Sequence, residues 1–240
     1  MALRIGFDMD GVLADFAAEY HAVEERLFGP VVQTTRAGDP EEEERAEEEE
    51  DDAEGERKKK EEGRKKESGA FRRRRDIVWG AIATTPAFWQ TLKPTDPGAV
   101  RRIHALMLRY RWEVFFITQR PATDGDTVQR QTQRWLVDQG FDLPSVLVVA
   151  GSRGAAAGAL RLDYHVDDSP RNCIDVKSES GAKPLLITDP DDETTIASAR
   201  RLGIGTASTI MAALDILEQA SLARSQPPLL HRLAKIVGWH

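Results

Sequence analysis

The chain has 240 residues, and its composition excludes several classes of protein. This length allows one sizeable core with a small accessory domain. A formal net charge of −7 argues against a general nucleic-acid binder. A single cysteine, Cys173, rules out an internal disulfide framework. Because acids interrupt the short apolar segment near the N-terminus and no long apolar run follows, we expect a cytoplasmic protein with no signal peptide and no membrane contact.

The first predicted strand is an apolar run from Ile5 to Phe7 that ends at two acids, Asp8 and Asp10, followed by Gly11. Residues i and i+2 of a strand point to the same side, so both carboxylates would leave the sheet together at its carboxyl end, where open α/β sheets bind ligands. Carboxylates this close repel unless a cation such as Mg²⁺ lies between them or one stays protonated. Taken alone, the tetrapeptide could equally be an ordinary turn.

A helix is predicted over residues 14–28, and the composition then changes abruptly. Residues 41–56 carry twelve acids against one arginine, and residues 57–75 carry eleven bases against three acids. Such a segment buries too little apolar surface to offset the entropy of ordering it. We therefore predict a disordered insertion at about residues 38–71, with a charged helix held by i,i+4 pairs as the alternative. A phosphate-binding patch at Arg72–Arg75 is less favoured, because nearby acids compete for the same charges.

Two aromatic-rich segments, residues 77–82 and 86–94, follow the insertion and are predicted to form the core of a small helical cap. A helix over residues 99–109 then leads into a strand, residues 112–117. That strand ends at a hydroxyl, which is well placed to hydrogen-bond a phosphate oxygen. The candidate phosphate or substrate contacts here are Thr118, Gln119 and Arg120, and Arg120 could equally be a surface charge.

Asp126 is the predicted N-cap of a helix over residues 127–139. A third buried strand is predicted over residues 146–150. The nearest cation after it is Arg153, since no lysine lies between Val146 and Asp168.

A short apolar strand from Tyr164 ends at paired acids, Asp167 and Asp168. Adjacent residues on an extended strand point oppositely, so both acids reach one ion only where the strand bends into a loop, as Ser169-Pro170 indicates. Capping of the next helix is the simpler alternative for this pair alone. His165 is interpreted as a strand residue, because Mg²⁺ prefers oxygen ligands.

The rest of the chain alternates in the same way. A helix begins near Asn172, a strand spans residues 184–188, and a closing helix spans residues 210–217. Strands alternating with helices imply a Rossmann-like, doubly wound parallel sheet with helices on both faces. Residues 221–240 form a tail of helical periodicity whose partner the sequence does not indicate.

The segment from Asp8 to Phe16 resembles the first motif of the haloacid dehalogenase (HAD) superfamily of phosphatases, and is most similar to the 5′(3′)-deoxyribonucleotidase branch. The strand ending at Thr118 and the Asp167-Asp168 pair resemble the second motif and the metal-binding motif. The resemblance implies that Asp8 is the nucleophile, that Asp10 is the general acid/base, and that Mg²⁺ is bound by Asp8, Asp10, Asp167 and Asp168. The family expects a lysine that neutralises the phosphate, and Arg153 is the candidate to replace it.

The resemblance also implies a domain organisation and a reaction. Residues 1–17 and 97–220 would form the HAD-like catalytic core, and residues 18–96 the helical cap with its insertion. In the deoxyribonucleotidase-like branch a similar aromatic segment can border the substrate pocket, so base stacking is the alternative to a core role for Phe88 and Trp89. The implied activity is Mg²⁺-dependent hydrolysis of a small phosphomonoester through an aspartyl-phosphate, in the manner of a 5′-nucleotidase. The alternative is a non-catalytic phosphate-binding or scaffold protein, which the missing lysine favours. Whether the chain is a monomer or a homodimer stays open.

Overall fold

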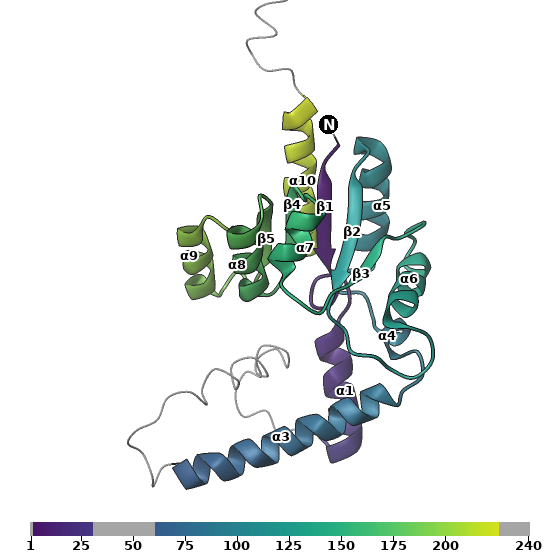
Figure 1. Cartoon of the computed structure of the whole chain (residues 1–240), viewed down its shortest axis with the longest axis vertical. Helices are drawn as coiled ribbons and strands as arrows, with labels where there is room; N and C mark the ends of the chain where they lie inside the picture. Colours follow the sequence, from purple (N-terminus) through teal and green to yellow (C-terminus); the bar gives the residue numbers. More distant parts are fainter. Residues whose placement is uncertain (1, 31–60, 226–240) are drawn as a thin grey trace, which may run out of the picture.

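The computed structural model describes residues 2–30 and 61–225, and it confirms the predicted α/β fold with a six-stranded parallel sheet (Figure 1). The strand order is β3-β2-β1-β4-β5-β6. The strands are β1 (Arg4–Asp8), β2 (Glu113–Thr118), β3 (Val146–Val148), β4 (Tyr164–Asp167), β5 (Lys183–Ile187) and β6 (Gly205–Ala207). Because every neighbouring pair is parallel, all six carboxyl ends lie at one edge of the sheet.

Helices connect these strands and cover the sheet. Within the described residues they are α1 (Phe16–Phe28), α3 (Glu61–Ala83), α4 (Phe88–Thr91), α5 (Ala99–Tyr110), α6 (Val128–Asp138), α7 (Arg153–Ala159), α8 (Pro170–Glu179), α9 (Glu193–Leu202) and α10 (Ile210–Ser225). None of them is long and apolar enough to cross a bilayer. The predicted helix over residues 99–109 is confirmed, and its apolar face is buried through Val100, Ile103 and Leu106.

The alternation of apolar residues along β2 shows why the sheet is covered on both faces. Val114 and Phe116 are buried in the hydrophobic cluster that α5, α6 and α10 complete. Ile117 points to the opposite face, into a second cluster formed with residues of α7 and α8. Side chains of a strand alternate between faces, so apolar residues on both sides require a helical layer on each. This is the doubly wound arrangement expected from the sequence.

The helices α1, α3 and α4 lie beyond the carboxyl ends of the strands (Figure 1). Phe16 on α1 stacks on Trp79 of α3 with ring centroids 5.5 Å apart, and it also contacts Phe88 and Trp89 of α4. Phe88 and Trp89 are buried, as expected of core residues. An aromatic cluster therefore joins these helices beyond the edge of the sheet that carries the acids of the predicted motifs.

The charged insertion is described in part. Helix α3 begins at Glu61, so residues 61–71 are helical. This is the alternative that we gave for the segment, and not the disorder that we expected. The rest of the insertion lies outside the described residues. On the α3 stretch nearest the core, Arg74 donates to Glu24 of α1 at 2.5 Å and lies over the ring of Phe28. Arg74 thus packs against α1.

Three expectations from the sequence are wrong in detail. The N-cap of α6 is Thr127, whose hydroxyl accepts from the Arg130 N–H, while Asp126 pairs with Arg130 and Arg134 instead. Strand β3 is an edge strand, and its Val148 is 43% exposed, so this strand is not fully buried. Helix α10 continues to Ser225, five residues into the segment that we assigned to the tail. Residues 226–240 lie outside the described residues.

Candidate active site

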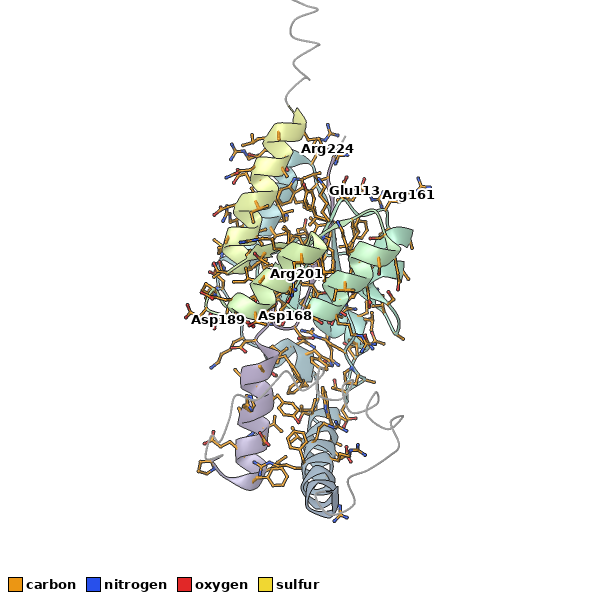
Figure 2. All side chains as sticks on the ribbon, turned by 90° about the vertical axis from the view of Figure 1, so that its left-hand side faces the viewer. Glu113, Arg161, Asp168, Asp189, Arg201 and Arg224 are labelled. Atoms are coloured by element: carbon orange, nitrogen blue, oxygen red, sulfur yellow. The ribbon has the colours of Figure 1, made fainter. Side chains whose placement is uncertain are left out.

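The sheet reverses its strand order between β1 and β4, and the candidate site lies at this switch point. Asp8 ends β1 and pairs in register with Ile117, so Thr118 lies one residue beyond it on β2. On the other side Phe7 pairs with Val166, which brings Asp167 beside Asp8. Neighbouring strands are about 4.8 Å apart, so the register alone gathers these side chains. Figure 2 shows Asp168 at this edge of the sheet, whereas Glu113 and Arg224 lie at the other.

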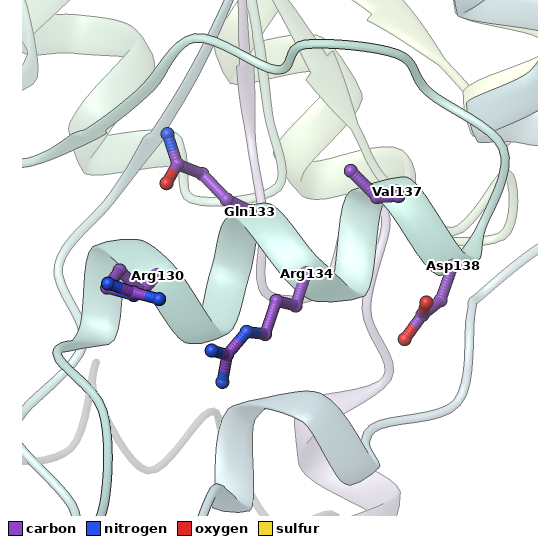
Figure 3. Close-up of a pocket in the computed structure, with 5 residues that line it drawn as sticks. All are labelled: Arg130, Gln133, Arg134, Val137 and Asp138. Atoms are coloured by element: carbon purple, nitrogen blue, oxygen red, sulfur yellow. The ribbon is translucent and has the colours of Figure 1, made fainter.

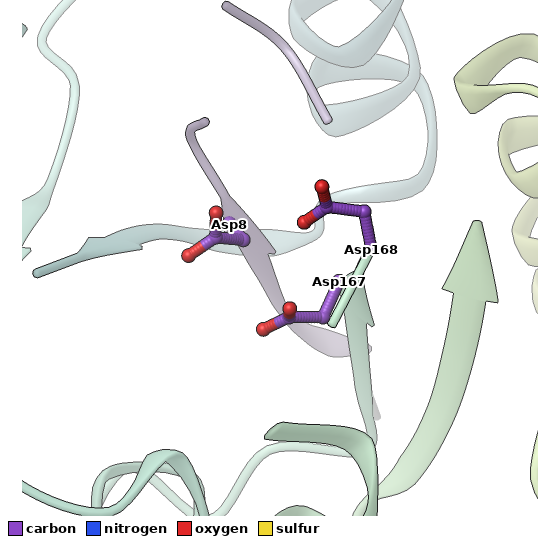
Figure 4. A group of neighbouring side chains, drawn as sticks. All are labelled: Asp8, Asp167 and Asp168. Atoms are coloured by element: carbon purple, nitrogen blue, oxygen red, sulfur yellow. The ribbon is translucent and has the colours of Figure 1, made fainter. Parts of the chain in front are cut away.

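Three carboxylates converge at the switch point (Figure 4). Asp8, Asp167 and Asp168 each offer an oxygen, and these oxygens all lie within 4.8 Å of one another. Asp8 and Asp167 are buried, which makes the mutual repulsion of their charges costly without a cation. Carboxylate oxygens are the donors that Mg²⁺ prefers. The donor set therefore fits the expected ion, with Asp8, Asp167 and Asp168 as the residues that would hold it.

Asp167 is the most constrained of the three carboxylates. Its Oδ2 is 2.8 Å from Nε2 of His165, and its Oδ1 accepts from the Ser169 N–H at 3.0 Å and from Nδ2 of Asn172 at 3.1 Å. Burial, the largest effect, would raise the pKa of Asp167, but the hydrogen bond and charge of His165, the charge of Arg153 and the hydrogen bond from the Ser169 N–H together lower it. Since the folded pKa lies below the ordinary 3.8, ionised Asp167 stabilises the fold above that pH, and the contribution is lost on further acidification.

Arg153 meets the nucleophile candidate directly. Its Nη2 donates to Oδ1 of Asp8 at 2.6 Å, and its Nε lies 3.8 Å from Asp167 Oδ2. Arg153 is the first residue of α7, where the Ser152 hydroxyl caps the helix by accepting from Gly154 N–H and Ala155 N–H. The cap fixes where the helix begins and hence where the guanidinium emerges. A buried cation thus stands beside Asp8.

Asp10 lies apart from the three-carboxylate cluster. Arg120 donates to it twice, from Nε to Oδ2 at 2.8 Å and from Nη2 to Oδ1 at 2.6 Å. The Thr118 hydroxyl is 3.5 Å from Asp10 Oδ2, at the limit of a hydrogen bond. Gln119 is half-buried in the loop after β2. The structure therefore brings Asp10, Thr118 and Arg120 together as one group, adjacent to the cluster around Asp8.

Sequence reasoning missed the residues that orient Asp167. His165 lies two positions before Asp167 on β4 and so faces the same side, which is a signal that period-2 alternation could have supplied. Asn172 returns to Asp167 from the first turn of α8, and no local pattern indicated that. Cys173, next along, is buried; burial first, then the charges of Asp167, Asp168 and Asp8, raise the pKa of its thiol. Burial and these charges therefore disfavour the thiolate form of Cys173.

We expect Gly6→Ala to destabilise the fold through His165. A Cβ at Gly6 would lie 2.7 Å from His165 Nδ1 and 2.7 Å from Leu162 Cδ1. The imidazole cannot retreat without leaving Asp167, so a loss of about 1 to 3 kcal/mol in unfolding free energy is expected. Gly80→Ala is the matched control, since nothing lies within 4 Å of its added Cβ on α3. Thermal denaturation of both variants tests this, and equal melting temperatures would contradict it.

Asp168→Asn should weaken Mg²⁺ binding, because the amide keeps an oxygen but loses the charge. Loss of a residue that merely orients metal ligands costs about 10- to 100-fold in affinity, and we expect an effect at least at the lower end of that range. Calorimetric Mg²⁺ titration measures it. Asp163→Asn is the control, because Asp163 accepts from the Arg4 N–H at 2.9 Å near the opposite end of β4. An unchanged affinity in Asp168→Asn would remove this residue from the site.

A separate surface hollow of about 350 Å³ runs along α6 and is lined by Arg130, Gln133, Arg134, Val137 and Asp138 (Figure 3). None of these residues belongs to the site at the switch point. Asp126 pairs with both arginines, Arg130 and Arg134, so part of their positive charge is compensated there. We assign the hollow no function.

Comparison with known proteins identifies the fold. No protein-family model and no curated protein sequence matches the chain. Several solved structures match the chain in fold. A hydrolase of the haloacid dehalogenase-like family from Streptococcus pneumoniae matches with a TM-score of 0.54 and 14% identity, covering 90% of this chain and 98% of its own. The chain has the haloacid dehalogenase-like fold. A hydrolase from Pseudomonas syringae matches with a TM-score of 0.53 and 12% identity, over 91% of this chain and 99% of its own.

Proposed function

We propose that this chain is a Mg²⁺-dependent phosphomonoester hydrolase that acts through an aspartyl-phosphate on Asp8. The observation that carries the proposal is the placement of Asp8, whose carboxylate lies at the switch point of the sheet, beside Asp167, Asp168 and the guanidinium of Arg153. A carboxylate nucleophile needs positive charge around it to approach an anionic phosphate. Arg153 supplies one buried cation, and Asp167 and Asp168, together with Asp8, offer ligands for a metal cation.

The family resemblance assigns the steps of the proposed reaction to residues at the site. An oxygen of Asp8 forms a bond to phosphorus as the ester P–O bond breaks, and Asp10 gives its proton to the departing oxygen. Asp10 then takes a proton from the attacking water, whose oxygen displaces Asp8 and releases phosphate. Thr118 and Arg153 would donate hydrogen bonds to the phosphoryl oxygens, with Gln119 as a further substrate contact. When bound, Mg²⁺ neutralises negative charge on the phosphate and on Asp8.

We further propose that residues 18–96 act as the cap and residues 1–17 and 97–220 as the catalytic core. In this proposal the aromatic cluster of α1, α3 and α4 closes over Asp8 and selects a small phosphorylated metabolite, as in 5′-nucleotidases. The first motif, Asp8 to Phe16, supports that substrate class by its resemblance to the deoxyribonucleotidase branch. Cap shape selects the substrate, so a panel of nucleoside monophosphates and sugar phosphates identifies it.

A non-catalytic, phosphate-binding protein is the second candidate. It is favoured by the ion pairs that engage both catalytic carboxylates, Asp8 with Arg153 and Asp10 with Arg120. Hydrolysis of p-nitrophenyl phosphate with Mg²⁺ and with EDTA separates the two candidates. Mg²⁺-dependent turnover supports the phosphatase. Binding of inorganic phosphate by calorimetry, without turnover of any ester in the panel, would establish the second candidate instead.

The division of roles has its own test. Asp10→Asn should still form the aspartyl-phosphate from an aryl phosphate but hydrolyse it slowly, because an amide cannot take a proton from water. Phosphoenzyme trapped by acid quench and seen by mass spectrometry would support the assignment. Full steady-state activity in Asp10→Asn would refute it.

A further inference from the structure

Arg120 makes a two-point contact with Asp10 and is itself withdrawn from solvent. Its side chain is 0% exposed, against 15% for the side chain of Asp10. The paired bonds of 2.8 and 2.6 Å join Nε and Nη2 to the two carboxylate oxygens. A bidentate guanidinium pair fixes the plane of the carboxylate as well as its position. Each oxygen keeps a further lone pair, so one of them can still carry the proton toward a substrate.

Two other elements hold Arg120 in place. Nη1 donates to the Thr132 hydroxyl on α6 at 3.0 Å, and the guanidinium carbon lies 4.7 Å from the centre of the Trp89 ring on α4. Trp89 is anchored in turn, because its indole N–H donates to the Pro121 carbonyl at 3.0 Å and its backbone N–H to Gln131 Oε1 at 3.2 Å. All but Pro121 of these residues are buried.

This arrangement is poorly explained by stability or by phosphate binding. A buried ion pair is often no more stabilising than apolar residues of the same volume. A phosphate ligand must present donors to the substrate, yet three of the five N–H donors of Arg120, one on each nitrogen, point to Asp10 and Thr132. The contact has a clear chemical consequence, however: Arg120 engages both oxygens of Asp10, and Asp10 is not among the acids whose oxygens cluster within 4.8 Å of one another, Asp8, Asp167 and Asp168.

We propose that Arg120 is a positioning residue for Asp10, and that Trp89 and Thr132 fix Arg120. It keeps Asp10 oriented for proton transfer and out of the metal ligand set, which revises our expectation that Arg120 contacts phosphate and that Asp10 binds the ion. The inference rests on the proposed phosphatase function. It also links α4, in the proposed cap, to the acid/base group through the Trp89 ring.

The test uses the different needs of two leaving groups. A p-nitrophenolate departs without a proton, whereas an alkoxide requires one from the general acid. Arg120→Gln should therefore lower kcat/KM about tenfold or more further for an alkyl phosphate, such as a nucleoside 5′-monophosphate, than for p-nitrophenyl phosphate. With the aryl ester, Asp10 is needed only for the second step, hydrolysis of the aspartyl-phosphate. In Arg120→Gln that step should become slow, so phosphoenzyme should accumulate and p-nitrophenolate should be released in a burst. Adding Arg120→Gln to Asp10→Asn should have little further effect.

Matched variants keep the test decisive. Thr132→Val removes one bond to Arg120 at nearly constant volume and should show the same leaving-group selectivity, to a smaller extent, even if Arg120→Gln folds poorly. Arg102→Gln, which removes the surface pair with Asp215, should leave the selectivity unchanged. An equal loss on both esters through KM, additive with Asp10→Asn, would mark Arg120 as a phosphate ligand and overturn the inference. If wild type hydrolysed no ester, the proposed function itself would fall.

Discussion

Asp8→Asn should abolish turnover, with a fall in kcat on the order of 10³-fold or more, as for loss of other covalent nucleophiles. The amide oxygen is too weak a nucleophile to form the bond to phosphorus, so no aspartyl-phosphate can accumulate. Mg²⁺-dependent hydrolysis of p-nitrophenyl phosphate measures the rate, and acid-quench mass spectrometry measures the phosphoenzyme. Asp126→Asn is the control, because Asp126 pairs with Arg130 and Arg134 on α6 and should leave both readouts unchanged.

The Asp8→Asn protein should still fold. Removing a partner from a buried ion pair costs roughly 3 to 5 kcal/mol when nothing replaces it. Here the oxygen of the new side-chain amide can still accept from Arg153, and the loss of one charge relieves repulsion from Asp167 and Asp168. We expect a melting temperature close to that of wild type. A wild-type rate in protein free of host phosphatase, and free of deamidation by mass, would end the covalent mechanism.

Local patterns indicated that acids would gather at one edge of the sheet, whereas the family resemblance supplied the expected ion and named Asp10 as a fourth ligand. Asp8, Asp167 and Asp168 each follow a short apolar run, and parallel strands deliver their carboxyl ends to one edge of a sheet. The register of β1 with β4 then places Asp8 beside Asp167, so the strand order is the only long-range information that this placement requires. Helical faces were predictable for the same reason, since a 3.6-residue period is a property of one segment. The buried residues Val128, Trp135 and Leu136 of α6 illustrate this.

Contacts between distant segments were not predictable. The Arg120 and Asp10 pair joins residues 110 positions apart, and the sequence offered Arg120 equally as a ligand or a surface charge. The partners of the Arg120 guanidinium depend on how α4 and α6 pack around it. No periodicity in the sequence predicts that packing. The exposure of Val148 has a similar origin. The sequence of an apolar strand is the same kind of run at the edge and at the centre of a sheet. Its burial depends on whether another strand pairs with its outer side, which the sequence of the strand does not show.

The proposal that Arg153 replaces the family's lysine is supported by its contact with Asp8. A guanidinium offers several directed donors, whereas an ammonium is a compact point charge. Arg153 uses this reach to contact Asp8 at 2.6 Å while its Nε lies 3.8 Å from Asp167, so one cation spans both buried acids. Such a cation offsets part of the negative charge of the three carboxylates before any ion or phosphate arrives. It is the observation that keeps both the phosphatase and the phosphate-binding proposals consistent with the sequence.

Gly11→Ala should disrupt the metal site from outside the ligand set. Gly11 has a φ of +74°, in the left-handed region, and a Cβ there would lie 1.8 Å from Asp168 Oδ2 and 2.5 Å from its Cγ. That distance is far below any tolerable contact, so the carboxylate must leave its position beside Asp8 and Asp167. The left-handed conformation adds about 1 to 2 kcal/mol for a residue with a Cβ. We expect Mg²⁺ affinity to fall by about 100-fold or more, beyond the effect of Asp168→Asn, which keeps an oxygen ligand.

The matched control for Gly11→Ala is Gly203→Ala. Gly203 ends α9 with a φ of +69°, so alanine meets the same backbone strain there, but the nearest atom to its added Cβ is the flexible Lys177 Nζ at 3.5 Å. Both variants should lose comparable stability from backbone strain, while Gly11→Ala alone loses Mg²⁺ binding in calorimetry. Equal affinities in the two variants would show that Asp168 can move without cost, and hence that it does not ligate the ion. The double variant Gly11→Ala with Asp168→Ala removes both the collision and the Asp168 carboxylate. If it bound Mg²⁺ as wild type does, Asp168 would likewise be excluded as a ligand, because the collision alone would explain the loss in Gly11→Ala.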